Sequence, residues 1–323
     1  MPTLKIKPLT ARLLDSAPEA GNGLHRWLIK GARMCQMSGV SPDRAFDLLA
    51  ATVVAQGGQI IPRSIRQAIE KAYSQPFTGG KYEKRPAWPE PDLGLIEELT
   101  LLRAWDVPGA LATLESKSPE KLNKTTGEIM RRLFPHDSLV AAGFEMEDTT
   151  VYQLSRIIDR LHKWRLIVPN PMLGEYGLTQ DNKQSGRCLS NTGPRRFLVT
   201  EFDFKPTNKQ GNPTIWAPLI NLWKAHGMFV QDACAAIVMR LAQHGPLAMV
   251  VFSGNISLHA WWYCAGEEES EGSRLRRFMQ YAASLGADTA TYTRSQFVRM
   301  PGATRPDGRK QTVHYLDTKG IEQ

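Results

Sequence analysis

The stretch FSGNISLHAWW, residues 252–262, follows an apolar run and decides how the second half of the chain is interpreted. The run Leu247–Phe252 has the composition of a β-strand, ends in a Ser-Gly turn, and leads into a second, alternating run. Because strand side chains repeat every two residues, Ser257, His259 and Trp261 share one face. A hydroxyl and an imidazole are therefore predicted side by side on a rigid strand. Taken alone, this pattern is more typical of a structural histidine than of a functional one.

A second predicted strand, Arg195–Phe204, ends in two carboxylates. Glu201 and Asp203 are two residues apart, so both side chains point to the same face, while Phe202 and Phe204 point to the other. Like charges side by side on a mostly apolar strand cost free energy unless a cation neutralises them. Carboxylates at this spacing suit Mg²⁺ or Mn²⁺, which use one or two carboxylates together with substrate phosphates. The alternative is a strand edge with solvated acids.

A third carboxylate and a basic loop follow. After Asp288, the sequence predicts a strand around Tyr292–Arg299, a glycine-containing loop to Gln311, and a return strand at Thr312–Leu316. The segment Ser273–Gln311 carries eight arginines and lysines against two aspartates, in a chain whose net charge is +8. Guanidinium groups match phosphate oxygens, so this loop beside a carboxylate cluster fits a metal-bound triphosphate.

The order of these motifs resembles the archaeo-eukaryotic primase superfamily, in particular the primase-polymerase branch of phages, plasmids and bacteria. That family has a paired-acid strand, a Ser-x-His strand and a later Asp. By this resemblance Glu201 and Asp203 match the first motif, Ser257 and His259 the second, and Asp288 the third. The chain departs from the family at Glu201, where the first acid is usually Asp, and the longer side chain puts the metal geometry there in question.

The resemblance implies an α/β fold, with a mixed sheet and flanking helices, and template-directed nucleotidyl transfer in DNA replication. Glu201, Asp203 and Asp288 would be catalytic metal ligands for Mg²⁺ or Mn²⁺. The nucleotide would be contacted by Ser257, His259, Arg299, Arg305 and Lys310. The implied partners are a single-stranded DNA template and nucleoside triphosphates. The chain has no Gly-x-x-x-x-Gly-Lys-Ser/Thr signature, so a helicase would be a separately encoded protein.

Two other functions use the same residues. The chain could be a non-catalytic replication-initiation or single-stranded-DNA-binding protein with a degenerate metal site, of which Glu201 is one sign. Such a protein would bind DNA without Mg²⁺ and would tolerate loss of Asp203. A metal-dependent nuclease is the third possibility, and the basic loop argues against it.

The remaining sequence predicts three regions. Residues 1–91 form a small helical accessory domain and a linker, with helices expected at Leu24–Ser38, Asp43–Ala55 and Ile61–Tyr73. Residues 92–148 form a helical connector with apolar stripes in Asp92–Trp105 and Thr126–Leu133. Residues 149–323 form the primase-like domain. It is predicted to open with a helix from Thr149 to Trp164 and to contain the further helices Trp216–His226, Gln231–Gln243 and Ser273–Leu285.

Composition narrows the setting. A pI near 9.3 is typical of proteins that meet nucleic acid or acidic membranes. The chain has no apolar run of about 18 residues, so no membrane span is expected. Four scattered cysteines without a Cys-x-x-Cys pair disfavour a zinc knuckle and a disulfide framework. Together with the absence of a signal-peptide core in residues 1–20, this predicts a cytoplasmic protein.

Overall fold

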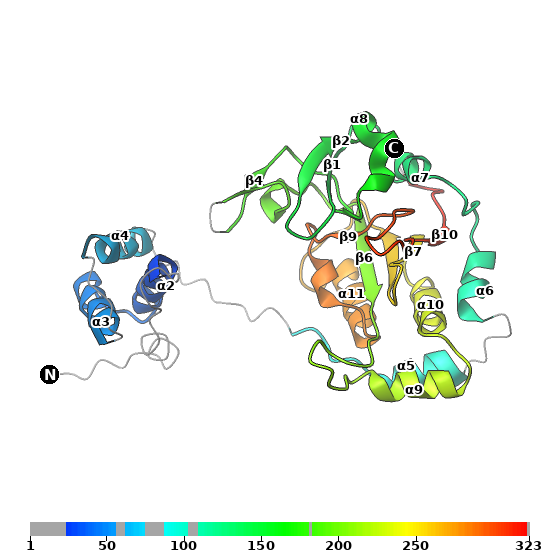
Figure 1. Ribbon diagram of the computed structural model, residues 1–323, viewed down its shortest axis with the longest axis horizontal. Helices are drawn as coiled ribbons and strands as arrows, with labels where there is room; N and C mark the ends of the chain where they lie inside the picture. Colours follow the sequence, from blue (N-terminus) through cyan, green and yellow to red (C-terminus); the bar gives the residue numbers. More distant parts are fainter. Residues whose placement is uncertain (1–23, 56–61, 75–86, 103–108, 181–182, 322–323) are drawn as a thin grey trace. The chain divides into compact units, whose positions relative to one another are not determined.

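The computed structural model describes residues 24–55, 62–74, 87–102, 109–180 and 183–321. The chain divides into two compact units, Met1–Ala87 and Trp88–Gln323 (Figure 1). Residues 76–86 of the linker predicted at Pro76–Pro91, and the end of the helix predicted to reach Trp105, lie outside the described residues. Within the described residues, no helix combines the length and the apolar character that crossing a membrane requires.

The described residues of the first unit form the helices α2 (Leu24–Met37), α3 (Pro42–Ala55) and α4 (Pro62–Tyr73), each within one residue of the bounds predicted from sequence. Each helix contributes one apolar face to a shared core, which includes Leu28, Leu49 and Ile65. Proline opens both α3 and α4, where the missing N–H costs no helical hydrogen bond.

The main sheet of the second unit has the strand order β10 (Val313–Leu316), β7 (Leu247–Phe252), β8 (Leu258–Tyr263), β6 (Phe197–Phe202). β6 and β7 are both antiparallel to β8 and are therefore parallel to each other. Helices α9 (Ala217–Ala225) and α10 (Val230–Leu241) join them, as the predicted crossover requires.

The α/β class is confirmed, but the predicted mixed pairing is wrong. Every strand pair in the part of the chain that the structure describes is antiparallel. The physical reason is that β8 lies between the two parallel strands β6 and β7 and hydrogen-bonds to both.

The two faces of the main sheet are covered differently. On one face Phe202, Ala260 and Trp262 pack in a core with residues of α9, α10 and α11 (Arg274–Ser284). On the other face Phe197, Val199 and Trp261 pack against α7 (Thr126–Leu133) and a second sheet. That sheet has the order β2 (Thr150–Gln153), β1 (Leu139–Gly143), β3 (Leu166–Ile167), β9 (Val298–Arg299). In Figure 1, β1, β2 and α7 lie above the main sheet, and α5 (Leu93–Glu97) and α9 lie below it.

Shorter elements complete the second unit. The segment after α5 continues as a π-helical turn, η1 (Glu98–Leu102), and α6 (Ala110–Ser116) follows the undescribed residues. The other short elements are α8 (Leu154–Ile157), η2 (Ile158–Lys163), β4 (Gly177–Leu178), β5 (Gln184–Ser185), η3 (Leu189–Asn191) and η4 (Thr289–Tyr292).

The helix predicted from Thr149 to Trp164 is wrong over its first part. Residues Thr150–Gln153 form strand β2, and only the remainder is helical. Thr150, Val151 and Tyr152 are β-branched or aromatic and pair with β1, so long-range pairing prevails over the helical spacing of the apolar residues.

Residues 92–148, predicted as a connector, pack against the rest of the second unit. The indole Nε1 of Trp223 in α9 donates to Thr100 Oγ1 over 2.8 Å, and both side chains are buried. Ser118 Oγ donates to the carbonyl of Leu316 at 3.2 Å and accepts from the Leu316 N–H at 3.0 Å. The segment is thus fastened to the end of β10.

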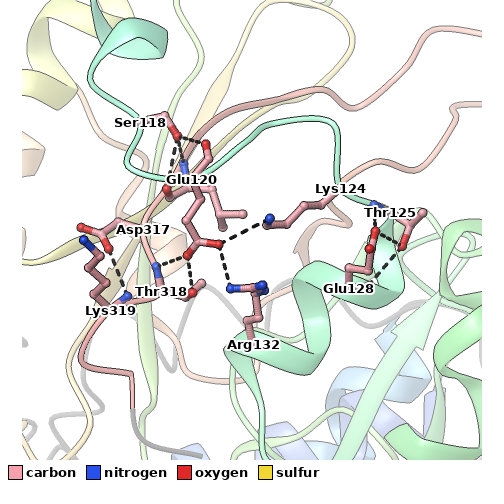
Figure 2. A network of polar contacts seen from close by, with 10 residues as sticks. Ser118, Glu120, Lys124, Thr125, Glu128, Arg132, Asp317, Thr318 and Lys319 are labelled. Carbon is pink, nitrogen blue, oxygen red and sulfur yellow. Dashed lines mark hydrogen bonds and ion pairs between the residues drawn. The ribbon is translucent and has the colours of Figure 1, made fainter.

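Glu120 is the centre of this fastening (Figure 2). Its carboxylate accepts hydrogen bonds from the backbone N–H and the hydroxyl of Thr318, lies 3.0 Å from the Arg132 guanidinium, and lies 3.7 Å from the Lys124 ammonium. Burial alone would raise the pKa of Glu120, but the Thr318 hydrogen bonds and the two cations outweigh it and hold the pKa below its ordinary value.

Glu120→Gln should therefore lower the free energy of unfolding by about 1–3 kcal/mol at neutral pH, because the amide cannot pair with both cations. A lowered pKa in the folded state stabilises the protein above the unfolded value of about 4.3 and ceases to do so as the pH falls through the folded value. The difference between wild type and variant should thus shrink below about pH 4. Chemical denaturation followed by tryptophan fluorescence measures it.

The control is Glu175→Gln, at an exposed glutamate whose side chain has no partner among the described residues. It should change the free energy of unfolding by less than about 0.5 kcal/mol. Equal effects of the two substitutions, or a Glu120 effect that persists undiminished at pH 3, would contradict the role assigned to Glu120.

Candidate active site

The strand registers place the predicted histidine and the first predicted acid directly opposite each other. In the antiparallel pair β6–β8, Glu201 is the partner of His259, and in β7–β8, Val251 is also the partner of His259. Their side chains share the face that carries Val199 and Trp261. Alternation along the strands thus puts a polar pair at the end of an otherwise apolar face.

A second row of polar side chains lies one step further along the same face. The pairs formed by Glu201, His259, Val251 and Val313 make the first row across the sheet. Two residues beyond that row, the same registers bring Gln311, Ser253, Ser257 and Asp203 side by side. The backbone N–H of Ser253 donates to the Ser257 carbonyl over 2.9 Å, so the pairing continues beyond the strand ends. Gln311, Ser253 and Ser257 are buried, and Asp203 lies partly exposed at the edge of the row.

His259 is buried and lies next to Ser257 of its own motif and Glu201 of the paired-acid motif. Its Nε2 is 3.4 Å from Ser257 Oγ and 3.5 Å from Glu201 Oε1, while its Nδ1 is buried and has no partner among the described residues. Burial lowers the pKa of His259, and the opposing charge of Glu201 does not restore it. The imidazole is therefore neutral at neutral pH and can donate from only one nitrogen at a time.

All three predicted carboxylates lie at this end of the sheet. The backbone N–H of Asp288 donates to the Glu201 carbonyl over 2.9 Å, which places the two residues on adjacent chain segments. The exposed Asp288 carboxylate accepts from the Ala290 N–H at 2.9 Å and caps η4. The Asp203 carboxylate forms an ion pair with Lys205.

The donor chemistry fits a hard divalent cation, with a restriction. Carboxylate oxygens are the ligands that Mg²⁺ and Mn²⁺ prefer. In the described part of the chain, however, no three His, Cys, Asp or Glu side chains converge closely enough to hold an ion by themselves. The arrangement fits an ion held by one or two of these carboxylates and completed by phosphate oxygens of a substrate.

Arg299 supplies a cation beside the acids. It lies half-buried on β9, opposite Leu166, and forms no ion pair with any residue that the structure describes. Burial and the neighbouring charge of Arg305 lower the pKa of Arg299, whereas Glu201 and Asp203 raise it, so these charges lie within electrostatic reach of one another. A guanidinium in this position can neutralise a polyanion that approaches the carboxylates.

The basic loop contacts the site through Arg305. Thr304 and Lys310 form a β-bridge, and Arg305 Nη1 donates to the Ser253 carbonyl over 3.2 Å. Within the part of the chain that the structure describes, the Lys310 side chain is exposed and forms no ion pair with the three carboxylates.

The structure shows that the basic residues of Ser273–Gln311 do not all present their charge to solvent. Arg276 is buried, with its guanidinium 3.5 Å from the centroid of Trp88. Arg274 lies 3.6 Å from Glu267, and Arg294 lies 3.7 Å from Glu269. Glutamates of the segment Glu267–Glu271 therefore neutralise part of the positive charge of Ser273–Gln311.

Sequence reasoning missed Lys205 and Gly286. Lys205 is two residues beyond Asp203, so the same alternation that joined Glu201 to Asp203 could have placed it on their face. Gly286 has a φ of +91°, and a Cβ there would lie 2.7 Å from the Phe204 ring. The absence of a side chain at Gly286 lets the Asp288 segment approach β6. This requirement depends on the packing of the Phe204 ring, which the sequence pattern does not show.

No family model and no curated protein matches this chain. Among solved structures, the AEP domain of the primase-polymerase of cyanophage S-2L is matched at 14% identity, over 59% of this chain and 87% of that chain, with a TM-score of 0.31. A TM-score this low does not establish a shared fold, and the function of this chain has to be inferred from its own side chains.

The turn at Gly254 offers a test of how the basic loop is seated. Gly254 has a φ of +78°, and a Cβ would lie 2.9 Å from both the Lys310 carbonyl oxygen and Arg305 Cδ. Gly308 has a φ of +81° with open space around it. Gly308→Ala should cost about 1 kcal/mol from the backbone conformation alone. Gly254→Ala should cost about 1–3 kcal/mol more, because backbone atoms of the loop must move.

Chemical denaturation of both variants measures this difference, and limited proteolysis should cut the segment 300–311 faster in Gly254→Ala than in Gly308→Ala. Indistinguishable stability and cleavage would show that the basic loop does not rest on this turn.

Proposed function

We propose that the protein is a template-directed nucleotidyltransferase, a DNA primase or polymerase that uses nucleoside triphosphates. The observation that carries this proposal is the pairing of Glu201 with His259 at the end of the main sheet, next to Asp203 and Asp288 and within electrostatic reach of Arg299. Acids, a neutral hydrogen-bonding pair and an unpaired guanidinium at one place match the oxygen-rich, highly charged surface of a metal-bound triphosphate.

Glu201, Asp203 and Asp288 would hold Mg²⁺ or Mn²⁺. When bound, such an ion acidifies an attacking hydroxyl and neutralises charge on the transferred phosphoryl group. In the reaction, a 3′-hydroxyl oxygen forms a bond to the α-phosphorus, the bond from that phosphorus to the bridging oxygen breaks, pyrophosphate leaves, and the hydroxyl proton passes to solvent.

The chain's own residues would position and neutralise the nucleotide. Arg299 would balance charge on the phosphates, and Arg305 and Lys310 would extend this positive surface along the loop. Ser257 and neutral His259 would hydrogen-bond phosphate oxygens, because the buried ring holds its position without adding a charge. Single-stranded DNA would be the template, and a separately encoded helicase would expose it.

One observation favours a non-catalytic alternative. Lys205 already neutralises Asp203, and Glu201 is one methylene longer than the aspartate usual in the resembling family. A protein whose acids are satisfied internally could bind single-stranded DNA as a replication-initiation or protective factor without a metal. The two functions differ in whether binding and synthesis depend on Mg²⁺ or Mn²⁺ and on Asp203.

Primer synthesis on single-stranded DNA, with labelled nucleotides and Mg²⁺ or Mn²⁺, tests the enzymatic function. Asp203→Asn and Asp288→Asn should each reduce synthesis by about 10²- to 10³-fold or more, since each removes a negative charge that acts on the reacting phosphates. Circular dichroism should show that both variants remain folded.

Asp159→Asn is the matched control, because Asp159 is an exposed aspartate whose ion-pair partner is Arg131, 2.9 Å away. It should retain wild-type synthesis. Undiminished synthesis in Asp203→Asn or Asp288→Asn would refute the assignment of the site. No synthesis by the wild type, together with DNA binding that persists in EDTA, would establish the non-catalytic alternative.

A further inference from the structure

The basic loop ends in a tight hairpin that rests on the turn after β7. The Arg305 N–H donates to the Arg309 carbonyl over 2.9 Å, and the Gly308 N–H donates back to the Arg305 carbonyl over 3.0 Å. Arg305 contacts the Ser253 carbonyl at 3.2 Å, and Arg309 donates to Asn255 Oδ1 at 2.5 Å. Both arginines are therefore anchored beside the second polar row of the site.

Asp307 lies at the tip of this hairpin between the two guanidinium groups. Its Oδ2 is 2.5 Å from Arg309 Nη2 and 3.6 Å from Arg305 Nε, and its Oδ1 accepts the Arg309 backbone N–H at 3.1 Å. Hydrogen bonds from Arg309 lower the pKa of Asp307 to about 2, so the carboxylate is ionised at every working pH. Two arginines directed at one anion form the kind of site that binds a phosphate group.

The hairpin is next to the carboxylate cluster in electrostatic terms. The charge of Arg305 lowers the pKa of Arg299, and the charges of Glu201 and Asp203 raise it, so all four side chains interact electrostatically. Arg305 also contacts the Ser253 carbonyl at 3.2 Å, in the polar row that aligns with Asp203, so the hairpin arginines lie beside the place where a triphosphate would bind.

We propose that Asp307 occupies the place of a phosphate group: Arg305 and Arg309 bind the polyphosphate of the incoming nucleotide, and Asp307 competes with it for both guanidinium groups. This inference rests on the proposed function, since it names the residues that hold the phosphates in that site. Carboxylate and phosphate oxygens accept the same forked hydrogen bonds from arginine, so one can replace the other.

The competition has a direct consequence for affinity. Binding of a polyphosphate breaks the two ion pairs of Asp307 and brings its charge close to the phosphates. A single phosphate group gains little from this exchange, whereas a triphosphate can also reach Arg299. Asp307 thereby lowers the affinity of the site for any phosphate ligand, and it lowers the affinity for monophosphates more than that for triphosphates.

Asp307→Asn separates competition from a purely structural role. The amide keeps the oxygen that accepts the Arg309 N–H and removes the charge. The matched control is Asp317→Asn, because Asp317 Oδ1 accepts the Lys319 N–H at 3.0 Å in the same geometry and forms no ion pair with any described residue. Isothermal titration of the full chain with Mg²⁺–dATP, with inorganic triphosphate and with dAMP measures affinity.

Asp307→Asn should bind dATP and inorganic triphosphate about three- to tenfold more tightly than wild type, the range expected when two surface ion pairs no longer compete. The ratio of its affinity for triphosphates to its affinity for dAMP should be smaller than in the wild type. Asp317→Asn should change the affinity for each ligand less than about twofold. Equal or weaker triphosphate binding by Asp307→Asn, with wild type binding normally, would overturn this inference alone. No triphosphate binding by any of the proteins would overturn both the inference and the proposed function.

Discussion

The antiparallel register between β6 and β8 is the constraint on which the rest of the second unit depends. It sets Glu201 against His259 and sends Phe202 and Trp262 to the opposite face, against the helices. A slip of one residue would turn every side chain of a strand to the other face, placing the acid in the apolar core against the helices and the aromatic rings on the face that carries the site. Because both faces of the sheet are covered, this register is strongly specified. The packing of the core therefore also fixes the positions of the side chains in the site.

The polar end of that face is costly in free energy. The His259 Nδ1 and both amide atoms of the Gln311 side chain are buried without partners among the described residues. Buried polar groups are normally hydrogen-bonded, and leaving one unsatisfied costs about 1–3 kcal/mol. The apolar surface on either side, from Trp261 to Phe204, offsets this cost.

The strands that carry the site and the helices that cover the main sheet could be predicted from sequence, because they follow from local spacing of polar and apolar residues. Strict alternation placed Glu201 and His259 on their strands, and apolar spacing located the helices that cover the other face. The assembly of the second sheet could not be found in this way. A strand was expected around Tyr292–Arg299, but only Val298–Arg299 is extended as β9, and its pairing with β3 joins segments far apart in sequence. The same limit applies to Arg276, whose burial depends on Trp88, and to the β-strand at Thr150, which takes its conformation from β1.

Net charge proved a poor guide to where the chain presents positive charge. Arg195 illustrates why: it is buried, 2.9 Å from Glu269 and stacked on Tyr292, so its charge holds the chain's own loops together. Arg305 and Arg309 are likewise satisfied internally by Asp307. Arg299, half-buried and next to the acids, is different, because nothing in the described chain pairs with it. Arg299 thus adds positive charge beside the three carboxylates, at the end of the main sheet where the proposed phosphate chemistry would take place.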